Sequence, residues 1–236
     1  MSRVPTQLFT NIARAIIATS RAIIFLFAAI LSLTATSLAD VQQAGQFDYY
    51  VLALSWSPSY CAGEAGQSDV QQCAPGRHFA FVVHGLWPQY AKGWPQDCVT
   101  SENWIPQKQI DGMMDIMPSK KLIIHEWKKH GACSGLSQQD YFNTVREIFG
   151  RLRVPARYLS PQADVTITPV QLVTDFVKSN EGMTADMLSV QCGNARDQAR
   201  LSELFVCVNK AGDFSACGVN EKRQCGAQTI VLPPVK

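Results

Sequence analysis

Two short segments carry three of the four histidines in this chain. The first, FAFVVHGLWPQY, contains His84, and the second, HEWKKHGAC, contains His125 and His130. Histidine is the one side chain that can give or accept a proton near neutral pH without a special environment. Two histidines at separate positions in the chain therefore suit a reaction in which one group takes a proton and another returns it.

The second segment has the spacing of a one-sided helix. A helix turns by roughly 100° per residue, so four polar groups of this segment fall within an arc of about 140°. They are His125, Glu126, Lys129 and His130. Trp127 falls outside the arc and is free to pack behind it, and the glycine after the last histidine is typical of a helix C-terminus. The segment predicts a short helix with its reactive groups on one face.

A zinc hydrolase is the first alternative, because His-Glu-x-x-x-His resembles the zincin motif. That motif needs its two histidines at i and i+4 on one helical face. Here His125 and His130 are five positions apart, and Lys129 would place an ammonium between them and repel the cation. The spacing therefore favours proton transfer over metal binding, and we expect no metal.

Residues 1–39 are predicted to be a signal peptide. Three arginines precede an apolar run at 22–33, and small residues after that run offer an A-x-A-like cleavage site. A run of about 12 apolar residues is too short to span a bilayer and matches a signal-peptide core. An uncleaved membrane anchor is the alternative. We expect residues 40–236 to be the mature protein, exported to the periplasm or secreted, with no membrane segment.

The charge of the mature protein differs from that of the whole chain. The full sequence has 21 basic and 19 acidic residues, a formal charge of +2. Removing 1–39 removes three arginines and no acidic residue, which leaves 18 basic and 19 acidic residues and a formal charge of −1. If the mature protein binds nucleic acid, its positive charge must therefore be local rather than global.

All eight cysteines follow the predicted signal peptide. In an exported protein an even number of cysteines indicates disulfides, here up to four, rather than metal sites. The chain has no CxxC, which argues against a zinc knuckle or a thioredoxin-like site, and sequence alone leaves about 105 full pairings open. It also has no N-x-[ST] sequon, which favours a bacterial periplasmic or secreted protein.

Helical and strand patterns are mixed along the mature chain. The predicted strands are 47–56, 78–84 and 201–208, and the predicted helices are 119–130, 139–152 and 169–179. The second strand is expected to end at a turn around Gly85 and Pro88. Loops are expected at 89–106 and, polar and Gly-rich, between Cys61 and Cys73. The mixture without strict alternation favours an α+β fold over a doubly wound sheet.

The segments His84-Gly85-Leu86-Trp87-Pro88 and His125-Glu126-Trp127-Lys128-Lys129-His130-Gly131 resemble the two signature segments of the ribonuclease T2 family. These are exported acid-base endoribonucleases, and the opening strand YYVLALSWSPSYC is similar as well. The resemblance covers roughly residues 46–226. It implies an α+β fold in a single disulfide-bonded domain, 40–236, whose antiparallel sheet carries the active site with helices packed around it. It implies no metal and no cofactor.

The resemblance also implies a role for each residue of the two motifs. By this comparison, His130 is the general base and His84 is the general acid. His125 binds the phosphate. Glu126 and Lys129 stabilise the crowded, highly charged transition state.

The resemblance also implies that Trp87 helps to form a wall on which a base stacks. From its place between the motifs, Tyr90 is expected to bind substrate as well. Tyr90, Trp94 and Trp104 lie between the motifs and could offer stacking platforms for unpaired bases or cover the core. The chain departs from the family pattern at Gln89-Tyr90, where some members place an acidic residue for purine recognition. We expect Trp127 to lie in the core.

The resemblance narrows the disulfide pairings as well. Cys98 with Cys133 matches the family bridge between the loop after the first motif and the end of the second. Cys192 with Cys225 and Cys207 with Cys217 match a nested pair near the C-terminus. Cys61 with Cys73 is left by subtraction.

The expected protein is thus a metal-independent endoribonuclease that cleaves single-stranded RNA through a 2′,3′-cyclic phosphate to 3′-phosphate ends. It is expected to act as a monomer, without cofactor, and to leave DNA intact. His78 is interpreted as structural. The remaining alternative is an exported binding or inhibitory module with relict catalytic groups, which intact reactive positions argue against. Breakdown of yeast RNA with and without EDTA would separate ribonuclease, metalloenzyme and binding module.

Overall fold

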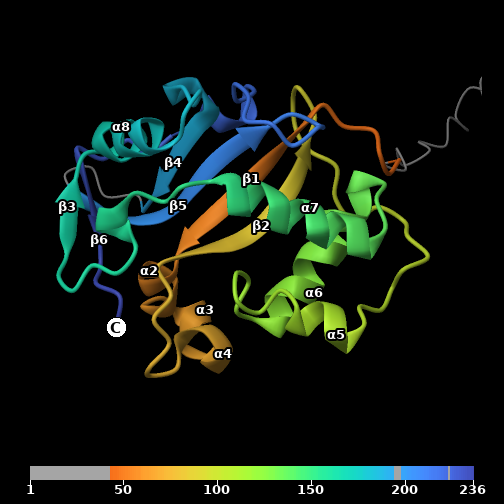
Figure 1. Ribbon diagram of the computed structural model, residues 1–236, viewed down its shortest axis with the longest axis horizontal. Helices are drawn as coiled ribbons and strands as arrows, with labels where there is room; N and C mark the ends of the chain where they lie inside the picture. The colour runs from red at the N-terminus through yellow and green to blue at the C-terminus, as the bar shows by residue number, and fades with distance from the viewer. Residues whose placement is uncertain (1–42, 194–197, 223) are drawn as a thin grey trace, which may run out of the picture. The chain divides into compact units, whose positions relative to one another are not determined.

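A computed structural model describes residues 43–193, 198–222 and 224–236 of the chain (Figure 1). The segment 1–39, interpreted above as a signal peptide, lies outside these residues. Within the described ranges no helix is both long enough and apolar enough to cross a membrane.

The strands in the described part of the chain form one six-stranded sheet. They are β1 (Tyr49–Trp56), β2 (Phe81–Gln89), β3 (Val165–Ile167), β4 (Leu188–Cys192), β5 (Gln198–Val208) and β6 (Thr229–Leu232). Their order is β2-β1-β5-β6-β3, and β4 also pairs with β5. The predicted α+β class is confirmed. The sheet is mixed rather than wholly antiparallel, because β5 and β6 run parallel.

The helices fall into a short group after β1 and a longer group between β2 and β4. The short group is α2 (Ser57–Cys61), α3 (Glu64–Gln67) and α4 (Val70–Cys73). The second group is α5 (Gln107–Asp111), α6 (Lys120–Lys129), α7 (Gln138–Arg151) and α8 (Pro169–Ser179). The predicted helices at 119–130, 139–152 and 169–179 are confirmed. The segment between Cys61 and Cys73 contains the short helices α3 and α4 rather than a loop, and Asp69 caps α4 by accepting a hydrogen bond from the N–H of Gln72.

The core lies between the sheet and the long helices. Figure 1 shows α7 lying across β1 and β2, and α8 beside β4. The side chain of Tyr141 in α7 and that of Leu52 in β1 are both fully buried in this core. The helical spacing of the apolar residues in α7 produces this face: Tyr141, Phe142, Val145 and Ile148.

A bulge interrupts the pairing of β1 with β2 at His84. Ala53 of β1 faces Gly85 and the next residue, Leu54, faces Val83, so His84 is an extra residue on β2. As a result Val83 and Leu86 both belong to the core although they are three apart. The bulge in the same way allows His84 and Trp87, also three apart, to contact each other.

The prediction that this strand ends at His84 was wrong. β2 continues through Gly85 and Pro88 to Gln89. Proline lacks the N–H that a central strand needs, but β2 is the edge strand of the sheet, where a missing donor is tolerated. The residues that suggested a turn are therefore compatible with a strand at this place in the fold.

Four disulfides hold the connecting segments. They join Cys61 with Cys73, Cys98 with Cys133, Cys192 with Cys225 and Cys207 with Cys217. The last three are the pairs that the resemblance implies, and the first is the pair that was left by subtraction. The Cys98–Cys133 bridge ties the segment after β2 to the 3-10 helix Gly131–Ser134 that follows α6.

Candidate active site

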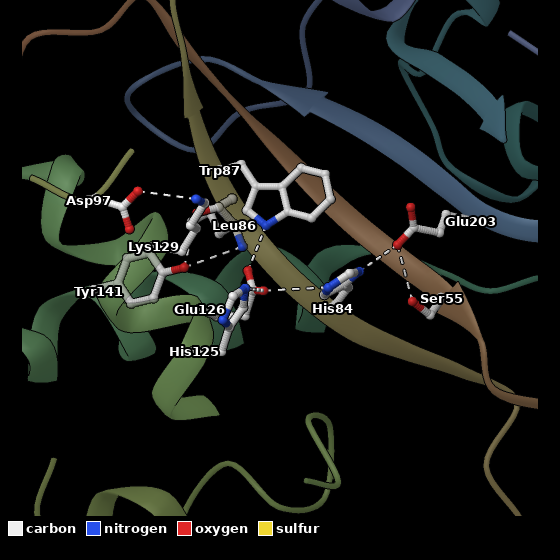
Figure 2. Close-up of polar contacts among 10 residues, drawn as sticks. All are labelled: Ser55, His84, Leu86, Trp87, Asp97, His125, Glu126, Lys129, Tyr141 and Glu203. Carbon is white, nitrogen blue, oxygen red and sulfur yellow. Dashed lines mark hydrogen bonds and ion pairs between the residues drawn. The ribbon is translucent and has the colours of Figure 1, made fainter. Parts of the chain in front are cut away.

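His84 lies between two carboxylates that come from different elements (Figure 2). Its Nδ1 lies 2.6 Å from Oε1 of Glu203 on β5, and its Nε2 lies 3.4 Å from Oε1 of Glu126 on α6. Ser55 on β1, the strand between β2 and β5, donates a hydrogen bond to the same oxygen of Glu203. The sheet therefore holds one side of the ring and α6 the other.

The two carboxylates determine the charge of His84. Burial of the ring lowers its pKa, but hydrogen bonds to Glu126 and Glu203, together with their negative charges, outweigh burial and raise the pKa of His84 to about 10. The imidazole is therefore a cation at neutral pH. It holds a proton that it can give.

Glu126 is the centre of the hydrogen-bonded cluster. Its side chain is 1 % exposed. Oε2 accepts a hydrogen bond of 2.6 Å from Nε1 of Trp87, and Oε1 lies 4.0 Å from Nε2 of His125 as well as near His84. A buried carboxylate is costly unless donors and positive charges surround it. These three side chains supply them.

Gly85 allows the carboxylate of Glu126 to reach the strand. A Cβ atom at this position would collide with Oε2 of Glu126 and with Nε1 of Trp87. Tyr141 of α7 fixes the next residue, because its hydroxyl donates a hydrogen bond of 3.0 Å to the carbonyl oxygen of Leu86 and accepts one of 3.4 Å from the Leu86 N–H (Figure 2). The strand, α6 and α7 are thus locked together beside the bulge.

His130 follows the last residue of α6. Its N–H donates the final helical hydrogen bond to the carbonyl of Glu126, at 3.0 Å. Gly131 then begins the 3-10 helix, and a Cβ there would stand 2.7 Å from the ring of Trp127 and 2.9 Å from that of Tyr141. The glycine that sequence analysis interpreted as a helix stop is required by close packing.

The environment of His130 shifts its pKa opposite to that of His84. Burial lowers it, and the positive charges of His125, His84 and Lys129 lower it further, so that it falls to about 4 despite the attraction of Glu126. Its Nδ1 is buried and has no hydrogen-bond partner among the described residues. His130 is therefore neutral over most of the pH range and can accept a proton.

The other two polar groups of this segment are more open. The side chain of His125 is 61 % exposed. Nζ of Lys129 lies 3.1 Å from Oδ2 of Asp97, whose own N–H donates to the carbonyl of Lys129. The disulfide at Cys98 fixes the neighbouring position of this loop. Lys129 is thereby held at the site by the segment that follows β2.

A cavity of about 410 Å³ opens beside Trp87. Lys129 and His130 line it, and so does Phe205, whose ring centroid lies 5.4 Å from that of Trp87. The ring of His130 also contacts Trp87, with centroids 5.3 Å apart. Trp87 therefore stands between His84 on one side and this cavity on the other.

Three comparisons with known proteins identify the family of this chain. The family model described as the Ribonuclease T2 family matches residues 47–217. The chain belongs to the Ribonuclease T2 family. It is 36 % identical over 210 residues to a ribonuclease of Aeromonas hydrophila, covering 82 % of this chain and 89 % of the relative. It is 28 % identical over 207 residues to Ribonuclease 3 of Arabidopsis thaliana, covering 78 % and 89 %.

A solved structure has the same fold. The crystal structure of RNase NT in complex with 5′-AMP superposes with a TM-score of 0.61 at 24 % identity, covering 80 % of this chain and 98 % of the other. The protein is a ribonuclease of the T2 type, and the reaction of this family is metal-independent transphosphorylation through a cyclic phosphate.

The metal-ligand geometry of this ribonuclease differs from that of a zincin. Among the described residues, one group of three potential ligands has its ligand atoms within 4.8 Å of one another: Cys207, Cys217 and Glu221. Two of these are joined in a disulfide, which leaves a single carboxylate. His125 and His130 belong to no such group in the described ranges.

The aromatic residues after the first motif are placed differently from one another. Tyr90 packs against the core cluster and is absent from the lining of the cavity beside Trp87, whereas Trp94 lines it and is 51 % exposed. Trp104 is 80 % exposed and covers no core. Trp127 is 1 % exposed, which confirms the prediction that it lies in the core.

His78 lies outside the strand in which it was predicted. β2 begins at Phe81, and His78 precedes it as an exposed residue in an irregular segment. It therefore shares no strand face with His84 and does not pack as a structural histidine.

Glu203 is the residue of the ribonuclease site that sequence analysis missed. A signal for it exists in LSELFVCV, where Leu204 and Val206 are core residues and Glu203 and Phe205 alternate with them. Alternation places an acidic side chain on the face away from the core. That Glu203 contacts His84 could not be predicted, because the contact depends on the pairing of Ser55 with Glu203 between β1 and β5.

Proposed function

We propose that the ribonuclease cleaves single-stranded RNA with His130 as general base and His84 as general acid. The observation that carries this assignment is the opposite shift of two pKa values at one site, to about 10 for His84 and to about 4 for His130. When the environments of two titratable groups shift their pKa values in opposite directions, the group that stays protonated is suited to be the acid. The group that stays neutral is suited to be the base. At neutral pH each histidine is then ready for its step.

The reaction begins at the ribose. His130 removes the proton of the 2′-hydroxyl, and the oxygen attacks the adjacent phosphorus. The bond from phosphorus to the 5′-oxygen breaks, and His84 gives its proton to that leaving oxygen. The products are a 2′,3′-cyclic phosphate and a free 5′-hydroxyl. In the second stage water opens the cyclic phosphate to a 3′-phosphate, with the roles of the histidines reversed.

His125 and Lys129 are proposed to bind the negative charge of the phosphate. His125 supports this role because it is exposed beside Glu126, and Lys129 because it lines the cavity next to His130. Glu126 is proposed to stabilise the transition state indirectly. It accepts from Trp87 and attracts His84 and His125, so it keeps these donors directed at one place.

Trp87 is proposed as the wall on which a base stacks, since its ring borders the cavity of about 410 Å³. Trp94 can supply a second surface there. Tyr90 is proposed only as a support for this wall, because it packs against the core. Stacking on aromatic rings requires unpaired bases, which is why we propose single-stranded RNA.

We propose that the ribonuclease is exported as a monomer after removal of residues 1–39. Four disulfides support the export, because disulfides persist in oxidising compartments such as the periplasm or the extracellular space.

Three single substitutions and one double substitution test the catalytic assignment. His84→Ala and His130→Ala should each reduce kcat by about 10²-fold to 10⁴-fold on a single-stranded RNA, and the double variant should be little worse, since groups acting as a unit are not additive. His78→Ala is the matched control and should retain full activity. EDTA should have no effect. Near-normal turnover by His130→Ala would contradict the proposal.

A further inference from the structure

A second, larger cavity lies on the opposite side of His84 from Trp87 and its cavity. Its volume is about 710 Å³, within the range of nucleotide-sized sites. The disulfide between Cys61 and Cys73 forms one wall, and Pro233, Pro234 and Lys236 of the C-terminal segment form another. Figure 1 shows the C-terminus on the side of the molecule where α2 lies. The indole Nε1 of Trp56 donates to the carbonyl of Pro233, which holds the two walls together.

The charged side chains of this lining are predominantly basic. They are Arg77, Arg200, Lys236 and Asp164. Arg77 and Arg200 are exposed, and neither makes a side-chain hydrogen bond or ion pair with any described residue. Three other arginines of the described residues are paired with aspartates: Arg146 with Asp115, Arg151 with Asp213 and Arg157 with Asp175. Two guanidinium groups without a partner among the described residues give this cavity a local positive charge, although residues 40–236 have a formal charge of −1.

The cavity is connected to the catalytic histidine through Gln72. Gln72 is buried, and its side chain donates to Oγ of Ser57 at the base of the cavity. The same Gln72 lines a small recess of about 50 Å³ that His84 also lines. The acidic residue of this recess, Asp69, already accepts from the hydroxyl of Tyr60 and the N–H of Gln72. The recess at His84 and the cavity at the arginines therefore adjoin each other, with Gln72 lining both.

The role of His84 indicates which part of the RNA would lie at the second cavity. His84 is assigned above as the group that protonates the 5′-oxygen of the leaving nucleotide, so the RNA on the 3′ side of the cleaved bond departs past His84. The RNA on the 5′ side lies toward His130, Trp87 and the cavity of about 410 Å³. The two cavities are therefore on opposite sides of the scissile phosphate.

We propose that the cavity at Arg77 and Arg200 is an RNA-binding subsite for the phosphates of the strand 3′ of the cleaved bond. Arginine presents a planar fork of donors that matches phosphate oxygens. The half-buried ring of Phe79 and the prolines of the lining offer apolar surface for the sugars and bases. This inference rests on the proposed function, because the direction of the strand follows from the role of His84.

The test uses deoxy strands that contain a single ribonucleotide, so that each has one cleavable bond. One strand is extended only on the 3′ side of that bond, one only on the 5′ side, and a dinucleotide has neither extension. For Arg77→Ala/Arg200→Ala we expect kcat/KM on the 3′-extended strand to fall by about fivefold to tenfold. The dinucleotide and the 5′-extended strand should be unaffected. Asp164→Asn, which removes the opposing carboxylate, should raise kcat/KM on the 3′-extended strand.

The salt dependence provides a second readout. Each phosphate contact on a single strand contributes about −0.7 to the slope of log affinity against log salt concentration. The slope for the 3′-extended strand should be reduced in magnitude by roughly 1.4 in the double variant. Arg153→Ala/Lys178→Ala is the matched control, because both residues are exposed, have no side-chain ion pair among the described residues and line neither cavity. It should leave the slope unchanged.

Binding of a 2′-O-methylated strand, which requires no turnover, separates this inference from the proposed chemistry. Weaker binding of its 3′-extended form by Arg77→Ala/Arg200→Ala would support the subsite even if the roles of the histidines proved wrong. An equal loss on the dinucleotide, a loss confined to the 5′-extended strand, or behaviour equal to that of the control variant would overturn it.

Discussion

Glu203 and His84 are joined across β1, with Oε1 of Glu203 2.6 Å from Nδ1 of His84 although the residues are 119 positions apart. Because Glu203 occupies Nδ1, the nitrogen left to face the phosphate is Nε2, which lies toward Glu126. One carboxylate thus fixes the orientation of the ring and both keep it protonated. Glu203 is a positioning residue for the proposed general acid.

Glu203→Gln should therefore change the pH profile more than the maximal rate. The amide can still accept a hydrogen bond from Nδ1, so the ring keeps its orientation, but one of the two negative charges that raise the pKa of His84 is lost. The alkaline limb of kcat/KM should move to lower pH, while the plateau value stays within about threefold. Ser55→Ala, which removes only the hydroxyl that donates to Glu203, is the control. An unmoved alkaline limb would show that Glu203 has a merely structural role.

The unmodified enzyme should have a broad plateau of kcat/KM between two limbs. The base must be deprotonated, so activity should rise as the pH increases through the pKa of His130, about 4. The acid must be protonated, so activity should fall as the pH increases through the pKa of His84, about 10. Because kcat/KM reports the free enzyme, these are the relevant pKa values. Measurement from pH 3 to pH 11 on a dinucleotide checks both, and a narrow optimum would contradict the assignment.

The elements that sequence predicted best are those whose pattern is local. The helix at 139–152 follows from apolar spacing, and the helix at 119–130 follows from polar groups that share one face. The strand at 47–56 follows from its aromatic and branched residues. β3 and β4 are short and depend on partners elsewhere in the chain, so no local pattern distinguishes them. The histidines of the site could be found from the sequence because they lie within the two family motifs.

Long-range pairing explains what the sequence did not predict. The bulge that turns His84 and Trp87 to one side depends on the register of β1 against β2, and Glu203 reaches His84 only because β1 lies between their strands. The two arginines at one cavity are a property of the folded surface, since Arg77 and Arg200 are remote in sequence. Tyr90 follows the motif directly, yet the fold directs it to the core.

Gly85→Ala should inactivate the enzyme although it adds a single methyl group. The new Cβ would collide with the carboxylate of Glu126 and the indole nitrogen of Trp87, and both would have to move. A displacement of about 1 Å in a catalytic group can cost about 10²-fold, so kcat should fall by about that factor. The free energy of unfolding should decrease by about 1–3 kcal/mol, as expected for overpacking.

Gly150→Ala is the matched control for this change. Gly150 lies within α7, and nothing stands within 4 Å of a Cβ built there. Alanine should raise the free energy of unfolding by about 0.5–1 kcal/mol and leave kcat unchanged. Full activity in Gly85→Ala would show that the position of Glu126 beside the strand is unimportant.

The last prediction concerns the nucleophile, which is proposed to be the 2′-hydroxyl of the RNA itself. Two histidines with opposite pKa shifts can move protons, but the attacking oxygen must be held close to the phosphorus, and a neighbouring 2′-hydroxyl already is. A deoxy strand with one ribonucleotide should therefore be cut once, directly 3′ of that ribose, and its 5′ fragment should end first in a 2′,3′-cyclic phosphate and later in a 3′-phosphate. The same strand with a 2′-O-methyl group at that ribose should resist completely, and duplex RNA should resist because stacked bases are not available to Trp87. Mass spectrometry of early products distinguishes the outcomes. Cleavage of the methylated strand, or early fragments with 5′-phosphates, would require water as the nucleophile and exclude the proposed roles of His130 and His84.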